Sequence, residues 1–159
     1  METIKRMKKL ELRLPPPLVA IFVFGLEFLV SKIIKITEYQ LFALKIIAVL
    51  LILGGFVLGI IGIQAFRKKS TTILPNHPEQ SSVLVQDGIY AYTRNPMYLG
   101  IFVGLVGIAF YYCNFASLLI SFLFPLYITR FQILPEERAL REKFGDVYQN
   151  YMQKVRRWL

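Results

Sequence analysis

The sequence predicts an all-α integral membrane protein with about four transmembrane helices and a C-terminal amphipathic helix on the cytosolic side. Its 159 residues are 55% hydrophobic and only 18% charged, whereas soluble domains average about 45–50% apolar and about 25% charged residues. The segment 46–66 carries no charged residue, and an apolar run of about 20 residues is what a helix needs to cross a bilayer. The uncharged segment 95–129 is too long for one such helix.

The individual elements follow from apolar runs and their breaks. Cys113-Asn114 divides the long uncharged segment into two arms, and Pro125 is expected to kink the second arm. Pro135 suits the first position of a last helix, in which apolar residues recur every three or four positions and Gly145 is only a mild blemish. The whole chain, 1–159, is treated as a single domain. The expected spans are about 18–34, 42–66, 96–112 and 115–129, with a cytosolic loop at 67–95 and the last helix at 135–157.

The distribution of basic residues predicts the orientation. The formal net charge is +9, and Lys and Arg are concentrated in the segments 5–13, 67–94 and 130–157. Cytoplasmic segments of membrane proteins carry such an excess of Lys and Arg. Both termini and the polar loops are therefore expected in the cytosol, and this explanation is favoured over a nucleic-acid partner. The single cysteine permits no disulfide within the chain and fits no multi-cysteine metal framework.

Two segments combine groups that a packed span does not need. In the segment 84–100, a turn glycine precedes Arg94 and several tyrosines where the chain re-enters the membrane. In the segment 135–151, Glu136 and Glu137 stand where the fourth span meets the cytosolic helix. Because the third and fourth spans form a hairpin, Arg94 and Glu136 are expected on the same face and close in space.

An arginine, paired carboxylates and aromatic walls suit a zwitterionic ligand such as S-adenosylmethionine. The arginine would bind its carboxylate, a glutamate its ammonium or ribose hydroxyls, and tyrosine rings its adenine or sulfonium. A purely structural explanation stands beside this one. In that case the arginine is a cytosolic anchor, the tyrosines form an interfacial belt, and the glutamates only cap a helix.

The same residues carry a family resemblance. The pattern Gly88-Ile89-Tyr90, Arg94-Asn95-Pro96-Met97-Tyr98-Leu99-Gly100, Glu136-Glu137, then Phe144-Gly145 with Tyr148 and Tyr151 resembles the isoprenylcysteine carboxyl methyltransferases and their phospholipid-methyltransferase relatives. Thr71-Thr72-Ile73-Leu74-Pro75 is similar to bacterial members. The resemblance covers about residues 54–157. It implies a small integral membrane enzyme that binds S-adenosylmethionine in a cytosolic pocket and takes a lipid-like or prenylated substrate from the bilayer.

The resemblance also implies roles for single residues. Arg94 and Glu136 are the expected catalytic residues, and no metal site is expected. Asn95 stands where the prenylcysteine enzymes have a histidine, a variant found in bacterial relatives, so a prokaryotic inner membrane is the expected location. Those enzymes place a substrate-binding arginine four residues before the cofactor glutamate; here this position is Gln132, and the nearest arginine is Arg130. The implied cofactor contacts are Leu84, Val85, Tyr90, Arg94, Asn95, Pro96, Met97, Tyr98, Glu136 and Glu137.

Several alternatives remain open from the sequence. The methyl acceptor could be a prenylcysteine carboxylate, a small thiol, an amine or a phospholipid headgroup. An NADPH-dependent membrane reductase of the sterol-reductase type shares related C-terminal features, and a non-catalytic scaffold is the third class.

Four further features are open to interpretation. Glu27 lies within a span and is either functional or structural, in which case it pairs with Lys45 or faces the bundle. The glycines 54, 55, 59 and 62 indicate close helix packing or, as in phospholipid relatives, proximity to the cofactor. His77 is expected to be a solvated loop residue, and Cys113 is given no role.

Overall fold

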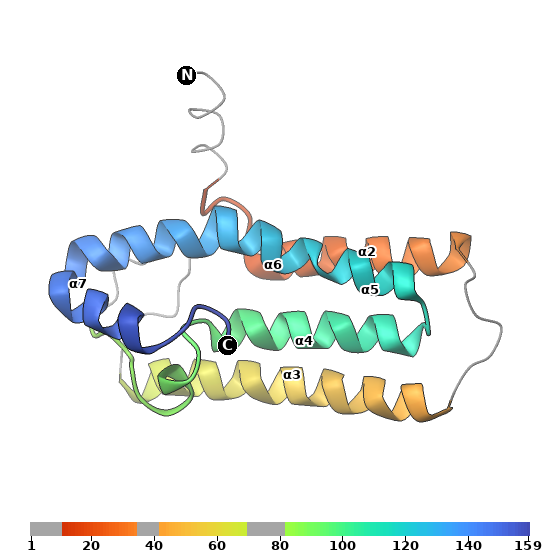
Figure 1. Ribbon diagram of the computed structural model, residues 1–159, viewed down its shortest axis with the longest axis horizontal. Helices are drawn as coiled ribbons and strands as arrows, with labels where there is room; N and C mark the ends of the chain where they lie inside the picture. The colour runs from red at the N-terminus through yellow and green to blue at the C-terminus, as the bar shows by residue number, and fades with distance from the viewer. Residues whose placement is uncertain (1–10, 35–41, 70–81) are drawn as a thin grey trace, which may run out of the picture.

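The computed structural model describes residues 11–34, 42–69 and 82–159, and this part of the chain is helical with short turns and no strand (Figure 1). The prediction of an all-α fold is thereby confirmed. Thr71–Pro75 and His77 lie outside the described residues. The helices, in chain order, are α2 (Pro16–Ile33), α3 (Phe42–Lys68), η2 (Gly88–Ala91), α4 (Pro96–Tyr111), α5 (Phe115–Ser121), α6 (Leu123–Ile128), η3 (Thr129–Ile133) and α7 (Leu134–Lys154).

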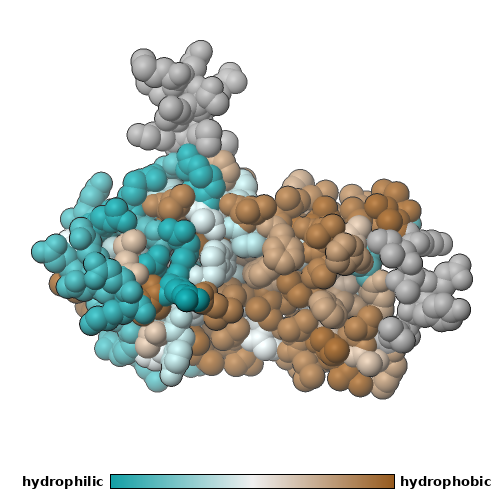
Figure 2. Space-filling model, viewed as in Figure 1, coloured by the Kyte–Doolittle hydropathy of each residue, from teal (hydrophilic) through white to brown (hydrophobic). Residues whose placement is uncertain are grey.

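Three stretches are long and apolar enough to cross a membrane within the described residues. They are α2, α3 and the helical run that begins at Phe115, whereas α4 is apolar but has only 16 residues. Figure 2 shows the apolar side chains gathered over the half of the molecule formed by α2 to α5, and the hydrophilic side chains over the half formed by α7. The fourth span therefore remains a prediction.

Helices α3 and α4 pack with their backbones in close contact. A Cβ atom added to Gly55 would lie 2.4 Å from the carbonyl oxygen of Gly100, and one added to Gly100 would lie 2.4 Å from that of Gly55. At Gly62 an added Cβ would lie 2.8 Å from Cγ of Met97. Two of the four predicted packing glycines thus need to be glycine for this contact, while an added Cβ at Gly54 or Gly59 meets nothing within 4 Å.

The span predicted at 115–129 is an interrupted helix. The side chain of Asn114 caps its start by accepting a hydrogen bond from the Ser117 N–H at 2.9 Å. The helix breaks at Phe122, between α5 and α6. Pro125 has no N–H to donate to the carbonyl of Ser121, so the break falls where the proline removes a backbone hydrogen bond. The continuation through η3 joins this span directly to α7.

The predicted bounds of the C-terminal helix, 135–157, are wrong. Helix α7 ends at Lys154, and Val155 has extended backbone angles. Gly145 is a break in the helix, with φ 52° and ψ −128°, a conformation that glycine adopts without steric penalty. Figure 1 shows the second part of α7 turning back toward the start of α4. The chain therefore returns to the polar end of α4 instead of continuing along one axis.

Glu27 is fully buried in α2, and its two carboxyl oxygens have no hydrogen-bond partner among the described residues. The alternative of pairing with Lys45 is therefore not seen, whereas burial of the side chain agrees with the alternative that Glu27 faces the bundle. On the same side of α2, the Ser117 hydroxyl donates to the main-chain oxygen of Glu27 at 2.9 Å. The carboxyl is thus buried within the bundle, on a helix that α5 contacts through Ser117.

Candidate active site

A carboxylate, a phenol and an amide meet where the first turn of α4 faces the start of α7. The Tyr98 hydroxyl donates to Oε1 of Glu136 at 2.6 Å. Nε2 of Gln132 donates to the same oxygen, also at 2.6 Å. Gln132 and Glu136 are four residues apart, so they lie on the same face of a helix. Both hydrogen bonds come from uncharged donors.

The Tyr90 side chain belongs to the same cluster. It comes from η2, is 4% exposed, and packs edge-on against Phe66 with ring centres 5.3 Å apart. Its main-chain oxygen accepts a hydrogen bond from the Tyr151 hydroxyl at 2.7 Å, whereas its own hydroxyl has no partner among the described residues. Burial raises the pKa of Tyr90, and electrostatic interaction with Tyr151 and Glu136 adds to this increase. The tyrosine is therefore a neutral donor and acceptor near Glu136.

The surroundings of Glu136 make its carboxyl easy to protonate. Burial raises its pKa from the ordinary 4.5 to about 7, while the hydrogen bonds from Tyr98 and Gln132 act in the opposite direction. The neighbouring charge of Glu137 adds to the increase. Among the described residues, no lysine or arginine contacts this carboxyl.

The second glutamate forms a separate cluster with two arginines. Nη2 of Arg94 lies 2.8 Å from Oε1 of Glu137, and the Arg157 guanidinium binds both carboxylate oxygens at 2.9 and 2.8 Å. Nη1 of Arg94 also donates to the main-chain oxygen of Met152 at 3.2 Å. The side chains of Arg94 and Glu137 are 8% and 6% exposed. The sequence predicted that Arg94 would lie close to Glu136. In the structure, Arg94 pairs with the next residue, Glu137.

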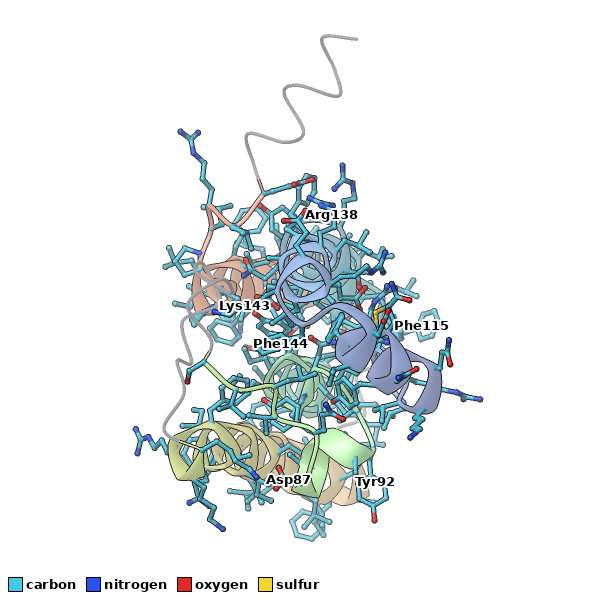
Figure 3. All side chains as sticks on the ribbon, turned by 90° about the vertical axis from the view of Figure 1, so that its left-hand side faces the viewer. Asp87, Tyr92, Phe115, Arg138, Lys143 and Phe144 are labelled. Carbon is cyan, nitrogen blue, oxygen red and sulfur yellow. The ribbon has the colours of Figure 1, made fainter. Side chains whose placement is uncertain are left out.

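The candidate substrate residues Arg130 and Gln132 point to different surroundings. Gln132 is in the Glu136 cluster, as described above. Arg130 instead forms an ion pair with Glu11 at 2.9 Å, and Arg138 binds the other oxygen of the same carboxylate. Figure 3, which looks onto the polar end, shows Arg138 on the outer side of α7. The structure therefore does not bring Arg130 to Glu136.

The other candidate cofactor residues surround the two clusters. Leu84 packs against the tyrosines of α7, and Val85 is 4% exposed. The Asn95 side chain donates to the main-chain oxygen of Arg157 at 2.9 Å. Pro96 and Met97 face Gly62 of α3. In Figure 3 the labelled Asp87 and Tyr92 mark the 82–95 segment on the side of this end opposite Arg138.

Sequence reasoning missed Arg157 and Trp158. Arg157 supplies two of the donors to Glu137, and the Trp158 indole donates to the Thr129 hydroxyl at 3.2 Å. Both residues were expected at or beyond the end of a continuous helix. The only available signal was Gly145, whose capacity for a positive φ allows the chain to reverse.

Comparison with known proteins agrees with this architecture. The sequence model of the phospholipid methyltransferase family matches residues 44–147. A protein named protein-S-isoprenylcysteine O-methyltransferase from Schizosaccharomyces pombe is 36% identical over 132 residues, covering 81% of this chain and 52% of that protein. Its namesake from Saccharomyces cerevisiae is 33% identical over 126 residues, covering 77% and 52%. An uncharacterized protein from Haemophilus influenzae is 44% identical over 63 residues, covering 40% of this chain and 100% of that protein.

The chain spans about half the length of the two yeast proteins. No solved structure matches it. The family model covers more than half of the chain, and it includes η2, α4 and the glutamates of α7. This chain therefore belongs to the phospholipid methyltransferase family, and it is related to proteins named protein-S-isoprenylcysteine O-methyltransferase.

Proposed function

We propose that this chain is an S-adenosylmethionine-dependent methyltransferase that acts on a lipid-like substrate in the membrane. The observation that carries this proposal is the Glu136 cluster. Its carboxylate accepts from two neutral donors, Tyr98 and Gln132, near the Tyr90 hydroxyl, which has no hydrogen-bond partner within the part of the chain that the structure describes. A glutamate that only caps a helix would need neither a buried phenol without a described hydrogen-bond partner nor a site without a described cation beside the carboxylate.

The residues present fit the cofactor that the family implies. S-adenosylmethionine carries a sulfonium and an ammonium, and a carboxylate compensated by no cation would attract both. A buried hydroxyl without a partner is costly, and a ligand with polar groups would relieve that cost at Tyr90. Glu136, Tyr90 and Tyr98 would hold the cofactor's polar part, with Leu84 and Val85 alongside. When bound, the cofactor supplies an electrophilic methyl group on a positively charged sulfur.

The contribution of the protein would be positioning. Transfer of a methyl group needs the acceptor atom and the methyl carbon in line and close together, and holding them so supplies a large part of the rate. Tyr98 rises from α4 and Glu136 from α7, so their hydrogen bond fixes two helices relative to each other. The starts of α4 and α7, which carry the cluster, lie where the apolar part of the molecule meets the hydrophilic part (Figures 1 and 2). There an acceptor from the bilayer could approach with little accompanying water.

The activity most like that of the named relatives is carboxyl O-methylation of a prenylated cysteine. A carboxylate acceptor needs no general base, and the described residues of the cluster offer none apart from Glu136 itself. The first alternative is an amine, a small thiol or a phospholipid headgroup. One observation favours it: Arg94 and Arg157 are both paired with Glu137, and Arg130 with Glu11. An acceptor carboxylate would then lie near Glu136 without a described cation to offset the repulsion. Methyl transfer to N-acetyl-S-farnesylcysteine and to phosphatidylethanolamine vesicles, measured side by side, separates the two.

The same pairing argues against the NADPH-dependent reductase. The phosphates of that cofactor need several arginines or lysines whose charge is not already used. The arginines nearest the Glu136 cluster, Arg94 and Arg157, bind Glu137. A titration of the purified protein with NADPH checks this alternative directly.

We also propose four spans, with both termini and the active site on the cytosolic side of a prokaryotic inner membrane, in a single domain. The concentration of Lys and Arg in three segments supports this orientation. The spans would be α2, α3, α4 and the run from α5 to η3, with membrane lipids around them. Helix α7 would then cap the bundle at the membrane surface.

The test of the proposed function is binding of S-adenosylhomocysteine, the demethylated product, by calorimetry in detergent. We expect micromolar binding by the wild-type protein and none by Glu136→Ala. Glu142→Ala is the matched control, because Glu142 lies on the same helix and is exposed. Absence of binding by folded wild-type protein would contradict the proposal.

A further inference from the structure

The last five residues of the sequence, 155–159, follow α7 without helical structure, and we call this segment the strap. It leaves α7 at Val155 and crosses to the start of α4 (Figure 1). The main-chain oxygen of Arg156 accepts a hydrogen bond from the Arg94 N–H at 3.1 Å. The main-chain oxygen of Arg157 accepts from the side chain of Asn95 at 2.9 Å. The strap therefore binds the turn that carries Arg94 into α4.

Arg157 binds this turn through its side chain as well. Its guanidinium donates to both oxygens of Glu137, and Glu137 in turn pairs with Arg94. Two arginines therefore surround one carboxylate whose side chain is 6% exposed, and the three groups together carry one net positive charge. Arg157 thus links two groups: its main-chain oxygen binds the Asn95 side chain, and its guanidinium binds the carboxylate that follows Glu136.

The strap also reaches the membrane side of the bundle. The Trp158 indole donates to the Thr129 hydroxyl at 3.2 Å, and its ring packs against the main apolar core. The strap is thereby fixed at both ends, to the turn at 94–95 and to the end of α6. Tyr98 follows the turn that the strap binds, and its partner Glu136 precedes the Glu137 carboxylate that Arg157 holds.

We propose that Arg157 is a positioning residue for the Glu136 site and that the strap is the element through which it acts. The inference rests on the proposed function, because it is tested through the affinity of the Glu136 site for S-adenosylhomocysteine. Arg157 does not touch Glu136. It holds Glu137 and the Asn95 turn, and so sets the distance between the first turn of α4, which bears Tyr98, and the first turn of α7, which bears Glu136.

The experiment compares Arg157→Gln, Arg157→Lys and Arg156→Gln in the full chain. Arg156 is the matched control, since its side chain is exposed and the strap uses only its main-chain oxygen. Two quantities are measured at a temperature where all variants have wild-type helix content by circular dichroism. They are the S-adenosylhomocysteine affinity by calorimetry and the emission of Trp158, which is the only tryptophan in the sequence.

We expect Arg157→Gln to weaken binding by about tenfold, because hydrogen bonds to a charged group are lost from a buried carboxylate, and to shift the Trp158 emission to the red. Arg157→Lys should recover part of the affinity, since an ammonium replaces only one branch of the guanidinium fork. Arg156→Gln should match the wild type in both measurements.

Unchanged affinity in Arg157→Gln would overturn the inference, whether or not the Trp158 emission moves, while leaving the proposed function standing. If the wild-type protein itself fails to bind, the proposed function fails and the inference with it. Equal losses in Arg156→Gln and Arg157→Gln would also overturn it, because the effect would then not belong to the Glu137 pair.

Discussion

Replacing Glu136 with glutamine should make the protein more stable while abolishing cofactor binding. Burial raises the pKa of Glu136 from 4.5 to about 7 in the folded protein. Between these values the folded protein binds the proton more readily than the unfolded chain does. The free energy of unfolding therefore falls as the pH rises through this window. Above about pH 7 the Glu136 carboxylate is ionised in both the folded and the unfolded protein. The folded protein then bears the full free-energy cost of burying the ionised carboxylate.

The magnitude follows from the two pKa values. Each pH unit between them corresponds to about 1.4 kcal/mol, which gives about 3 kcal/mol for the cost of holding the ionised carboxylate in the folded protein. Glutamine cannot ionise, yet its side-chain oxygen can still accept the hydrogen bond from Tyr98. We therefore expect Glu136→Gln to exceed the wild type in stability by up to about 3 kcal/mol at pH 8 and by little at pH 4.5.

The assay is unfolding by denaturant in detergent at several pH values, followed through Trp158 emission. Glu142→Gln is the control, because Glu142 is exposed on the same helix. The difference between Glu136→Gln and the wild type should grow with pH, and that for Glu142→Gln should stay flat. A Glu136→Gln variant whose stability runs parallel to the wild type from pH 4.5 to 8 would refute the reasoning.

Three further changes test the packing and the charge pairs. Glu137→Gln leaves the nearly buried guanidinium of Arg94 without its carboxylate, so the free energy of unfolding should fall by about 3 kcal/mol in the same denaturant assay. Gly55→Ala should lower the melting temperature, because its Cβ would overlap the backbone of α4, whereas Gly54→Ala, with open space around it, should not. Glu27→Leu removes a buried carboxyl that has no described partner and should raise the free energy of unfolding by at least about 1 kcal/mol; a loss of stability would show that the carboxyl is needed where it stands.

Much of the fold could be predicted because its signals are local. Pro96 fixes the start of α4, and Asn114 both divides the hairpin and caps its second arm. An uncharged run of fixed length then brings the two ends of the hairpin to the same side. The expectation that Arg94 and Glu136 lie at the same end of the hairpin follows from these three features, whereas the pairing of Glu136 with Tyr98 and of Arg94 with Glu137 was not predicted.

The rest depends on geometry that sequence spacing does not carry. Glu136 and Glu137 are neighbours, but on a helix they point about 100° apart, and no pattern states which of them faces Arg94. Arg157 lies 20 residues beyond its carboxylate partner. The apolar residues keep their helical spacing on both sides of Gly145, so the sequence pattern does not reveal the break there. Only the positive φ of Gly145 reverses the chain and brings the strap to α4.

The contact between α3 and α4 limits how the length of this protein can vary. Ala48, Gly55 and Gly62 are the α3 positions at which α4 comes closest, facing Gly107, Gly100 and Met97, and they are spaced seven residues apart. Seven residues make about two helical turns, so all three lie along one line. A single residue inserted between Ala48 and Gly62 would rotate one part of this line by about 100° relative to the other and place bulky side chains against the α4 backbone. We therefore expect single-residue insertions and deletions in α3 to be tolerated only outside 48–62. The length of α3 between these positions fixes where the polar end of α4 lies along it.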